Sequence, residues 1–185
     1  KNKEKYNEKP NAKQGGVFGS KGDKPRQFNS PYGVAFDSRN QRIIVSDGEN
    51  HRIQLFNRKM EHLNMFGSWG NKPGKFRIPR RVCLQPATNN IIVAESNNHR
   101  IQVFSNPEDG KEFKSLYIVG GTQSSQDPGK FYRPRGVTCN NRGHMIVADC
   151  NNHRVQILDE KGRFIRSMGT TGQSGSSNHQ FYHPC

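Results

Sequence analysis

The sequence lacks long apolar runs, and it holds few acidic residues and few cysteines. Apolar residues make up 30% of the 185 positions, and no run of them approaches the roughly 20 residues that a membrane-spanning helix needs. A helix that crosses a bilayer is therefore excluded. Residues 1–13 are rich in Lys, Asn and Glu and lack the apolar core of a signal peptide, so we expect a disordered basic flank there.

Cysteine is too scarce for a disulfide framework. The four cysteines, Cys83, Cys139, Cys150 and Cys185, include no Cys-x-x-Cys pair, whereas small secreted domains carry dense sets of cysteines. This favours a reduced chain in the cytoplasm. We expect Cys83 and Cys139 to be buried apolar residues of strands, while Cys150 replaces a polar turn residue and is open to an exposed position.

What the sequence does contain is an internal repeat. The segment FNSPYGV at 28–34 recurs as FRIPRRV at 76–82 and FYRPRGV at 131–137, and it begins again as FYHP at 181–184. A second block follows each full copy, at 43–56, 91–104 and 145–158. Because an overlooked repeat misassigns a whole fold, these copies are the starting point for every later inference.

Short β-branched runs within each repeat are separated by Asn, Gly, Ser and Asp, which is typical of strands and turns. Four antiparallel strands per repeat describe a blade of a β-propeller. We therefore predict an all-β propeller over 14–185, with blades at about 28–67, 76–119 and 131–168 and the start of another at 181–185, and with 14–19 as the end of an earlier outer strand. The expected strands are 33–37, 42–46, 52–57 and 61–67, then 81–85, 90–94, 100–105 and 113–119, then 136–140, 144–148, 154–158 and 163–168.

The Asn-His-Arg triplets at 50–52, 98–100 and 152–154, each downstream of a Phe-x-x-Pro-x-Gly/Arg-Val segment, resemble NHL repeats. The similarity extends to the C-terminal propellers of the TRIM-NHL and Brat class. The resemblance implies a ring of six blades, so we expect these three repeats to be part of a longer chain, with self-association as the alternative. It also implies binding of single-stranded or stem-loop RNA in mRNAs, for post-transcriptional regulation, from the inner rim of the propeller.

The positive charge is distributed unevenly between the two ends of the predicted strands. The net charge is +14. The crossovers between repeats, at 20–32, 68–81 and 120–135, carry eleven basic and two acidic residues, and the Asn-His-Arg turns beside them add three basic and four acidic. The turns at the opposite end carry nine basic and six acidic residues. Clustered Lys and Arg attract polyanions in a salt-dependent way, although a solvated surface without a partner is the plain alternative.

Aromatic rings alternate with this charge, as in proteins that stack unpaired bases on aromatic and guanidinium planes. Tyr32, Arg80 and Arg135 stand at the entrance of the innermost strands, where the resemblance implies RNA contacts. Trp69 and Tyr182 are further rings on the same end. The full set of candidate RNA-binding residues is Tyr32, Lys72, Lys75, Arg77, Arg80, Arg81, Tyr132, Arg133 and Arg135.

Several other functions are weighed against RNA binding. His51, His99 and His153 occupy the same place in successive repeats, too far apart to share one metal, so we expect them in hydrogen-bonded turns with their neighbouring carboxylates and arginines. Some propellers are metal-dependent hydrolases or lyases, but an inner rim of Tyr and Arg repels a cation. We therefore expect no enzyme activity, metal, cofactor or small-molecule substrate. The runner-up is a protein-interaction platform that recruits partners or substrates for a TRIM-type ubiquitin ligase.

Overall fold

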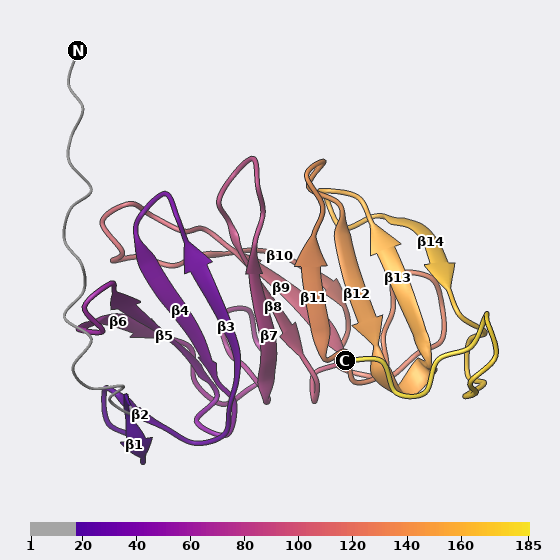
Figure 1. Ribbon diagram of the computed structural model, residues 1–185, viewed down its shortest axis with the longest axis horizontal. Coiled ribbons are helices and arrows are strands. Elements are labelled where there is room, and N and C mark those ends of the chain that lie inside the picture. The colour runs from indigo at the N-terminus through magenta and orange to yellow at the C-terminus, as the bar shows by residue number, and fades with distance from the viewer. Residues whose placement is uncertain (1–17) are drawn as a thin grey trace.

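The computed structural model describes residues 18–185, so the expected flank at 1–13 and residues 14–17 lie outside the described residues. Three four-stranded antiparallel sheets follow one another along the chain, and in each the strands pair in sequence order (Figure 1). The first sheet comprises β3 (Pro31–Asp37), β4 (Arg42–Asp47), β5 (Arg52–Asn57) and β6 (His62–Phe66). The second comprises β7 (Pro79–Leu84), β8 (Ile91–Glu95), β9 (Arg100–Phe104) and β10 (Ser115–Gly120). The third comprises β11 (Gly136–Cys139), β12 (Met145–Asp149), β13 (Arg154–Leu158) and β14 (Phe164–Met168).

The all-β propeller prediction is confirmed, and each sheet is one blade. One short 3-10 turn, η1 (Cys150–Asn152), is the single helical element in the part of the chain that the structure describes. No helix over residues 18–185 is long and apolar enough to cross a membrane.

Two apolar cores hold the blades together face to face. The first lies between blades one and two and contains Ile44, Ile53, Leu55, Phe76, Val82, Ile91, Val93 and Phe104. The second lies between blades two and three and contains Ile92, Ala94, Ile101, Val103, Val119, Phe131, Val137, Met145, Val147 and Leu158. Because alternate residues of a strand point to opposite faces, the middle blade feeds both cores, with Ile91 and Val93 on one side and Ile92 and Ala94 on the other.

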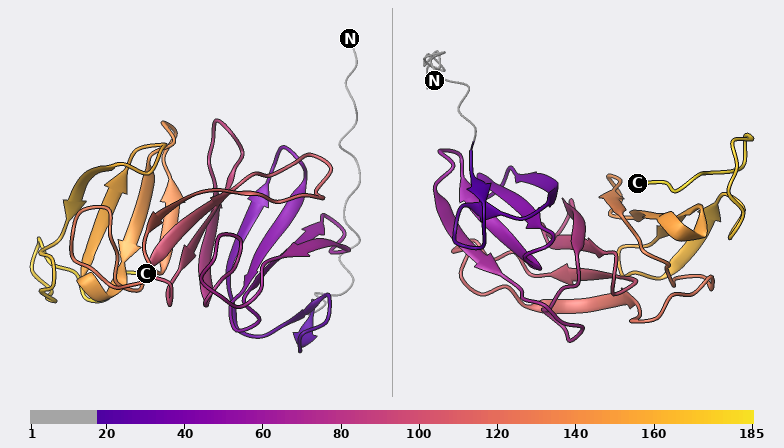
Figure 2. Two further views of the ribbon diagram at one scale, coloured as in Figure 1. Left: turned by 180° about the vertical axis from the view of Figure 1, so that it is seen from behind. Right: turned by 90° about the horizontal axis from the view of Figure 1, so that it is seen from below.

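The three blades form a crescent with the inner strands β3, β7 and β11 along its concave side (Figure 2). The ring does not close within residues 18–185. The inner strand of blade one consequently leaves Val34 64% exposed and Phe36 51% exposed. The chain crosses from blade to blade at the lower end of Figure 1, which faces the viewer in the right panel of Figure 2.

Three of the four crossovers contain a small parallel bridge that the sequence did not predict, while the crossover at 120–135 has the hydrogen bond from the Ser125 N–H to the Phe131 carbonyl but no such bridge. β1 (Ser20–Lys21) pairs with β2 (Gln27–Phe28), and the bridges Trp69 to Phe76 and Ser174 to Phe181 repeat this pairing. The expected outer strand at 14–19 is not seen in its described part, because Phe18 and Gly19 precede β1 outside any strand. The bridges give the crossovers a fixed backbone, and most of the candidate site residues lie on these segments.

Candidate functional site

A buried carboxylate organises the turn between the second and third strands of each blade. In blade two, Glu95 is fully buried and its two oxygens accept hydrogen bonds from Arg100 Nε at 2.7 Å, Asn98 Nδ2 at 2.7 Å and Gln102 Nε2 at 2.6 Å. Burial raises the pKa of Glu95, although these donors act in the opposite direction. Asp47 and Asp149 accept the equivalent bonds in the other blades, from Asn50, Arg52 and Gln54 and from Asn152, Arg154 and Gln156.

The arginine of this cluster also holds the crossover that precedes its own blade. Arg100 donates to the carbonyls of Asn71 at 2.6 Å and Lys75 at 2.8 Å. Arg52 and Arg154 bind the crossovers at 23–27 and 126–130 in the same way. These three arginines are therefore structural, and their charge is neutralised inside the protein.

The repeated histidines join neighbouring blades. His51 Nδ1 accepts the backbone N–H of Ile78 at 3.2 Å, and His99 Nδ1 accepts that of Arg133 at 3.1 Å. His153 Nδ1 accepts that of His183 at 3.3 Å. We expected these histidines to form hydrogen bonds within their own turns. That prediction is wrong for the imidazole rings, because each ring accepts a hydrogen bond from the backbone of the next repeat. The three residues whose backbone N–H groups donate these bonds, Ile78, Arg133 and His183, have positive φ angles between 44° and 55°. Such angles are uncommon outside glycine, and the histidine bond stabilises that backbone.

The histidine bonds predict a loss of stability in acid. Burial lowers the pKa of His99, helped by Arg133 and opposed by Asp149, and burial likewise lowers the pKa of His51. A histidine whose folded pKa lies below its unfolded value contributes full stability above about pH 6.5 and loses it as the pH falls toward the folded value. We expect the urea midpoint to drop between about pH 7.5 and 5, and to drop less in His99→Gln. The control is His179→Gln, at an exposed position, which is expected to keep the full pH dependence. If the urea midpoint falls equally with pH in the unsubstituted chain, His99→Gln and His179→Gln, the His99 bond is not the source of the acid sensitivity.

A second set of arginines, at the crossover end, has no carboxylate partner among residues 18–185. Arg80 lies over the ring of Tyr32, with 3.8 Å from Cζ to the ring centroid, and Arg77 lies over Trp69 at 4.7 Å. The Nε atoms of Arg77, Arg80 and Arg135 are buried and have no hydrogen-bond acceptor in the described part of the chain. Arg42 Nε at the opposite end shares this feature, so the buried Nε atoms alone do not mark a binding site. The three side chains are half-buried and no described carboxylate neutralises their charge, which leaves that charge available to an external anion.

The inner rim brings the equivalent residues of successive repeats together. Tyr32, Arg80 and Arg135 each follow the proline of the repeat, and Cys185 is the fourth occupant of that position. The backbone N–H of Arg81 donates to the carbonyl of Arg135 at 3.2 Å, and Arg135 Nη1 lies 3.7 Å from Cys185 Sγ. The strands approach so closely that a Cβ on Gly33 would meet the Arg80 carbonyl at 2.6 Å. The sequence thus predicted correctly that these positions share one rim.

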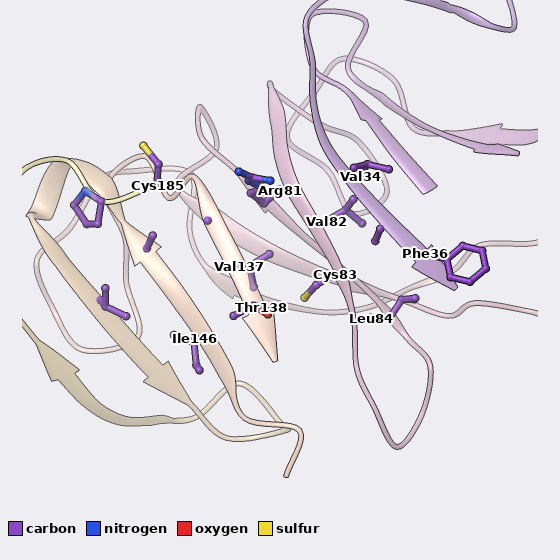
Figure 3. Close-up of a pocket in the computed structure, with 15 residues that line it drawn as sticks. Val34, Phe36, Arg81, Val82, Cys83, Leu84, Val137, Thr138, Ile146 and Cys185 are labelled. Carbon is purple, nitrogen blue, oxygen red and sulfur yellow. The ribbon is translucent and has the colours of Figure 1, made fainter. Parts of the chain in front are cut away.

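A hollow of about 690 Å³ runs along the concave side of the crescent. Its lining is mainly apolar, and Figure 3 shows Arg81 and Cys185 at one end, with Cys83 of β7 and Ile146 of β12 farther along the hollow. Hydrogen bonding to Cys139 and burial raise the pKa of the Cys83 thiol. Cys150 is fully buried, with Sγ 3.6 Å from His183 Nδ1, so the exposed position that the sequence left open for it is wrong.

The remaining candidates lie on or beside the crossovers. Lys72 and Lys75 are exposed, and Lys75 Nζ donates to Ser68 Oγ at 2.9 Å. Tyr132 is exposed, with its ring centroid 5.6 Å from that of His99. A smaller polar hollow brings together Arg77 and Arg133 from the candidate set with Trp69, Asn97 and His99. From the sequence, His99 was expected in a hydrogen-bonded turn and was not in the RNA-binding set, and Asn97, which precedes the Asn-His-Arg triplet at 98–100, was not selected.

At the opposite end of the strands, three of the basic side chains form ion pairs within the chain. Ion pairs there join Arg42 to Asp37 at 3.5 Å, Arg163 to Asp159 at 2.6 Å and Lys114 to Glu112 at 3.4 Å, and Arg39 donates to the carbonyl of Ala87 at 3.3 Å. None of the eleven basic residues of the crossovers forms an ion pair with the described residues. When the ion-paired residues are left out, the crossover end with its Asn-His-Arg turns has eleven basic residues and the opposite end has six, which is the same difference of five as in the full counts of fourteen and nine.

Comparison with known proteins gives a consistent result. The family model "NHL repeat" matches residues 28–56, 76–104 and 131–158. The chain is 34% identical to the protein brain tumor of Drosophila melanogaster over 152 residues, which are 82% of this chain and 14% of that protein. It is 53% identical to the B-box type zinc finger protein ncl-1 of Caenorhabditis elegans over 36 residues, 20% of this chain and 4% of that protein.

Solved structures share the fold. A protein of unknown function from Bacteroides thetaiotaomicron superposes with a TM-score of 0.64 at 19% identity, over 83% of this chain and 40% of that one. The chain thus spans a small part of its curated relatives and less than half of this propeller.

Proposed function

The chain is a segment of an NHL-repeat β-propeller, and on this premise we propose that its crossover end binds single-stranded or stem-loop RNA, as a step in post-transcriptional regulation of mRNAs. One observation carries the proposal: none of the eleven basic residues of the crossovers, Arg77, Arg80 and Arg135 among them, forms an ion pair with a described residue. Protein brain tumor is similar to most of this chain and belongs to the class whose resemblance suggested RNA.

The side chains at the crossover end favour a nucleic acid over a simple anion. Phosphates are positioned by Lys and Arg, and unpaired bases stack on aromatic and guanidinium planes. Arg80 on Tyr32 and Arg77 on Trp69 provide such planes already assembled. We assign base contacts to Tyr32, Arg80 and Arg135 and phosphate contacts to Lys72, Lys75 and Arg77, with Arg81, Tyr132 and Arg133 flanking them.

The proposal describes a binding module and not an enzyme. Among residues 18–185, no group of three or more His, Cys, Asp or Glu side chains is arranged to hold a metal ion, and the repeated histidines are used between blades. We also propose that residues 14–185 act as part of a longer ring of blades, in the cytoplasm, as the resemblance and the cysteine content suggest.

Losing one phosphate contact tests the proposal through its salt dependence. Lys72→Ala is expected to weaken binding of all single-stranded RNAs about equally and to lower the slope of log K against log salt by roughly one. Lys161→Ala, exposed at the opposite end, is the matched control. Fluorescence anisotropy of labelled RNA at several salt concentrations measures both slopes. If Lys72→Ala and Lys161→Ala change the slope equally, the crossover end is not the RNA surface.

A further inference from the structure

The polar hollow at the junction of blades two and three is a defined pocket within the basic surface. It occupies about 360 Å³ and is lined by Trp69, Arg77, Asn97, His99 and Arg133. We infer, on the basis of the proposed function, that this hollow binds one unpaired guanine base of the RNA. In this hollow Arg77 contacts the base instead of the phosphate assigned to it above, and Asn97, His99 and the stacking role of Trp69 are additional to the RNA-binding set.

Trp69 provides the stacking plane. Its side chain is 62% exposed, yet its backbone is fixed by the bridge to Phe76. The Arg77 guanidinium covers one face of the indole ring, with Cζ 4.7 Å from the ring centroid. A base that stacks on an aromatic ring gains about 1–3 kcal/mol, and a plane that is ordered before binding loses little entropy when a base arrives.

The lining of the hollow is rich in hydrogen-bond donors. His99 Nδ1 accepts the backbone N–H of Arg133, so the neutral imidazole carries its proton on Nε2 and that nitrogen is a donor. Within residues 18–185 the side chains of Arg77 and Arg133 make no hydrogen bond, since each residue bonds only through its backbone. The Asn97 side-chain amide, which makes no hydrogen bond to a described residue, adds one acceptor oxygen and one donor group. The hollow therefore suits a base edge dominated by acceptors.

Guanine matches this lining better than the other bases. Its O6 and N7 are adjacent acceptors, the arrangement that arginine recognises most often, whereas adenine and cytosine place an amino group at that edge. The N1–H and amino group of guanine are donors for the Asn97 oxygen. Uracil has acceptors but a smaller ring to stack on Trp69.

The other junctions of the same chain lack this combination. The positions equivalent to Trp69, set by the same crossover hydrogen bonds, are Lys21 and Ser124. The position equivalent to Asn97 in blade one is Glu49, whose charge repels phosphate. Only the junction of blades two and three therefore combines an indole plane with two arginines, among the described blades.

The sequence contains a single tryptophan, so Trp69 itself reports the binding event. We would use RNAs about 12 nucleotides long, all uridine except for one central guanosine, adenosine, cytidine or 7-deazaguanosine. The guanosine RNA is expected to quench Trp69 fluorescence saturably and to bind about tenfold more tightly than the adenosine and cytidine RNAs. The 7-deazaguanosine RNA, which lacks the N7 acceptor, is expected to lose most of that advantage.

Asn97→Ala is expected to remove most of the guanosine preference, and Asn151→Ala, the equivalent change in blade three, to leave it intact. Both positions lie in turns, so folding is checked by the melting temperature. RNA that binds with no change in Trp69 fluorescence, or with equal affinity for the four bases, overturns the guanine site and leaves the proposed function standing. If none of the RNAs binds at all, the proposed function fails together with it.

Discussion

Replacing Arg100 with methionine is expected to lower the free energy of unfolding by about 3–5 kcal/mol. Arg100 is almost fully buried, and its loss leaves the Glu95 carboxylate inside the protein without its countercharge. The carbonyl of Asn71 loses its donor at the same time, and that of Lys75 loses one of its two donors and keeps Gln102. Urea unfolding followed by circular dichroism measures the change.

The surface pair Arg163 and Asp159 is the control for this prediction. Its N–O distance is as short, 2.6 Å, but the Arg163 side chain is 74% exposed. Exposed ion pairs contribute about 0–1 kcal/mol, so Arg163→Met is expected to have little effect. If the two methionine variants lose similar stability, the buried clusters do not hold the crossovers as we describe.

Reversing the charge of Arg80 and Arg135 together is expected to weaken RNA binding by at least about 30-fold, because each base-contacting arginine contributes about 1–3 kcal/mol and each new glutamate repels phosphate. Both side chains lie at the inner rim, and neither forms an ion pair with a described residue whose loss would unfold the chain. Anisotropy with labelled single-stranded RNA at fixed salt measures the loss.

The matched control reverses two charges at the opposite end, Arg142→Glu with Lys161→Glu. Both residues are exposed and neither side chain contacts a described partner. Binding is expected to change by less than about threefold, since charges beyond a Debye length are screened. If the control abolishes binding while Arg80→Glu with Arg135→Glu does not, RNA binds the other end of the strands.

The strands were predictable because each repeat carries its own short apolar runs, and the three copies confirm one another. The strand starts shift by at most two residues: β3 and β7 begin at Pro31 and Pro79, two residues before the expected 33 and 81, and β10 begins at Ser115, two residues after the expected 113. Phe113 packs instead on Phe66, with stacked rings 4.4 Å apart, and the ladder is irregular at Ser115 and Tyr117. Side-chain packing therefore decided where that strand begins.

The site was only partly predictable, because some arginines form buried ion pairs while others, on the crossovers, form none. A carboxylate five residues before Arg52, Arg100 and Arg154 is a repeated sequence signal for the buried pairs. The histidine bonds had no such signal, since their partners lie 27, 34 and 30 residues further along the chain. The hollow beside Trp69 depends on how two blades meet, which no local pattern specifies.

The most direct test of the RNA interface is a competition that separates nucleic acid from negative charge in general. Labelled random single-stranded RNA, about 12 nucleotides long, is bound to the chain and displaced with unlabelled RNA or with polyglutamate of equal charge. Because stacking adds about 1–3 kcal/mol per base, the account predicts displacement by RNA at a concentration at least about tenfold lower. Displacement by both at the same concentration would contradict it and would favour a platform for acidic protein segments.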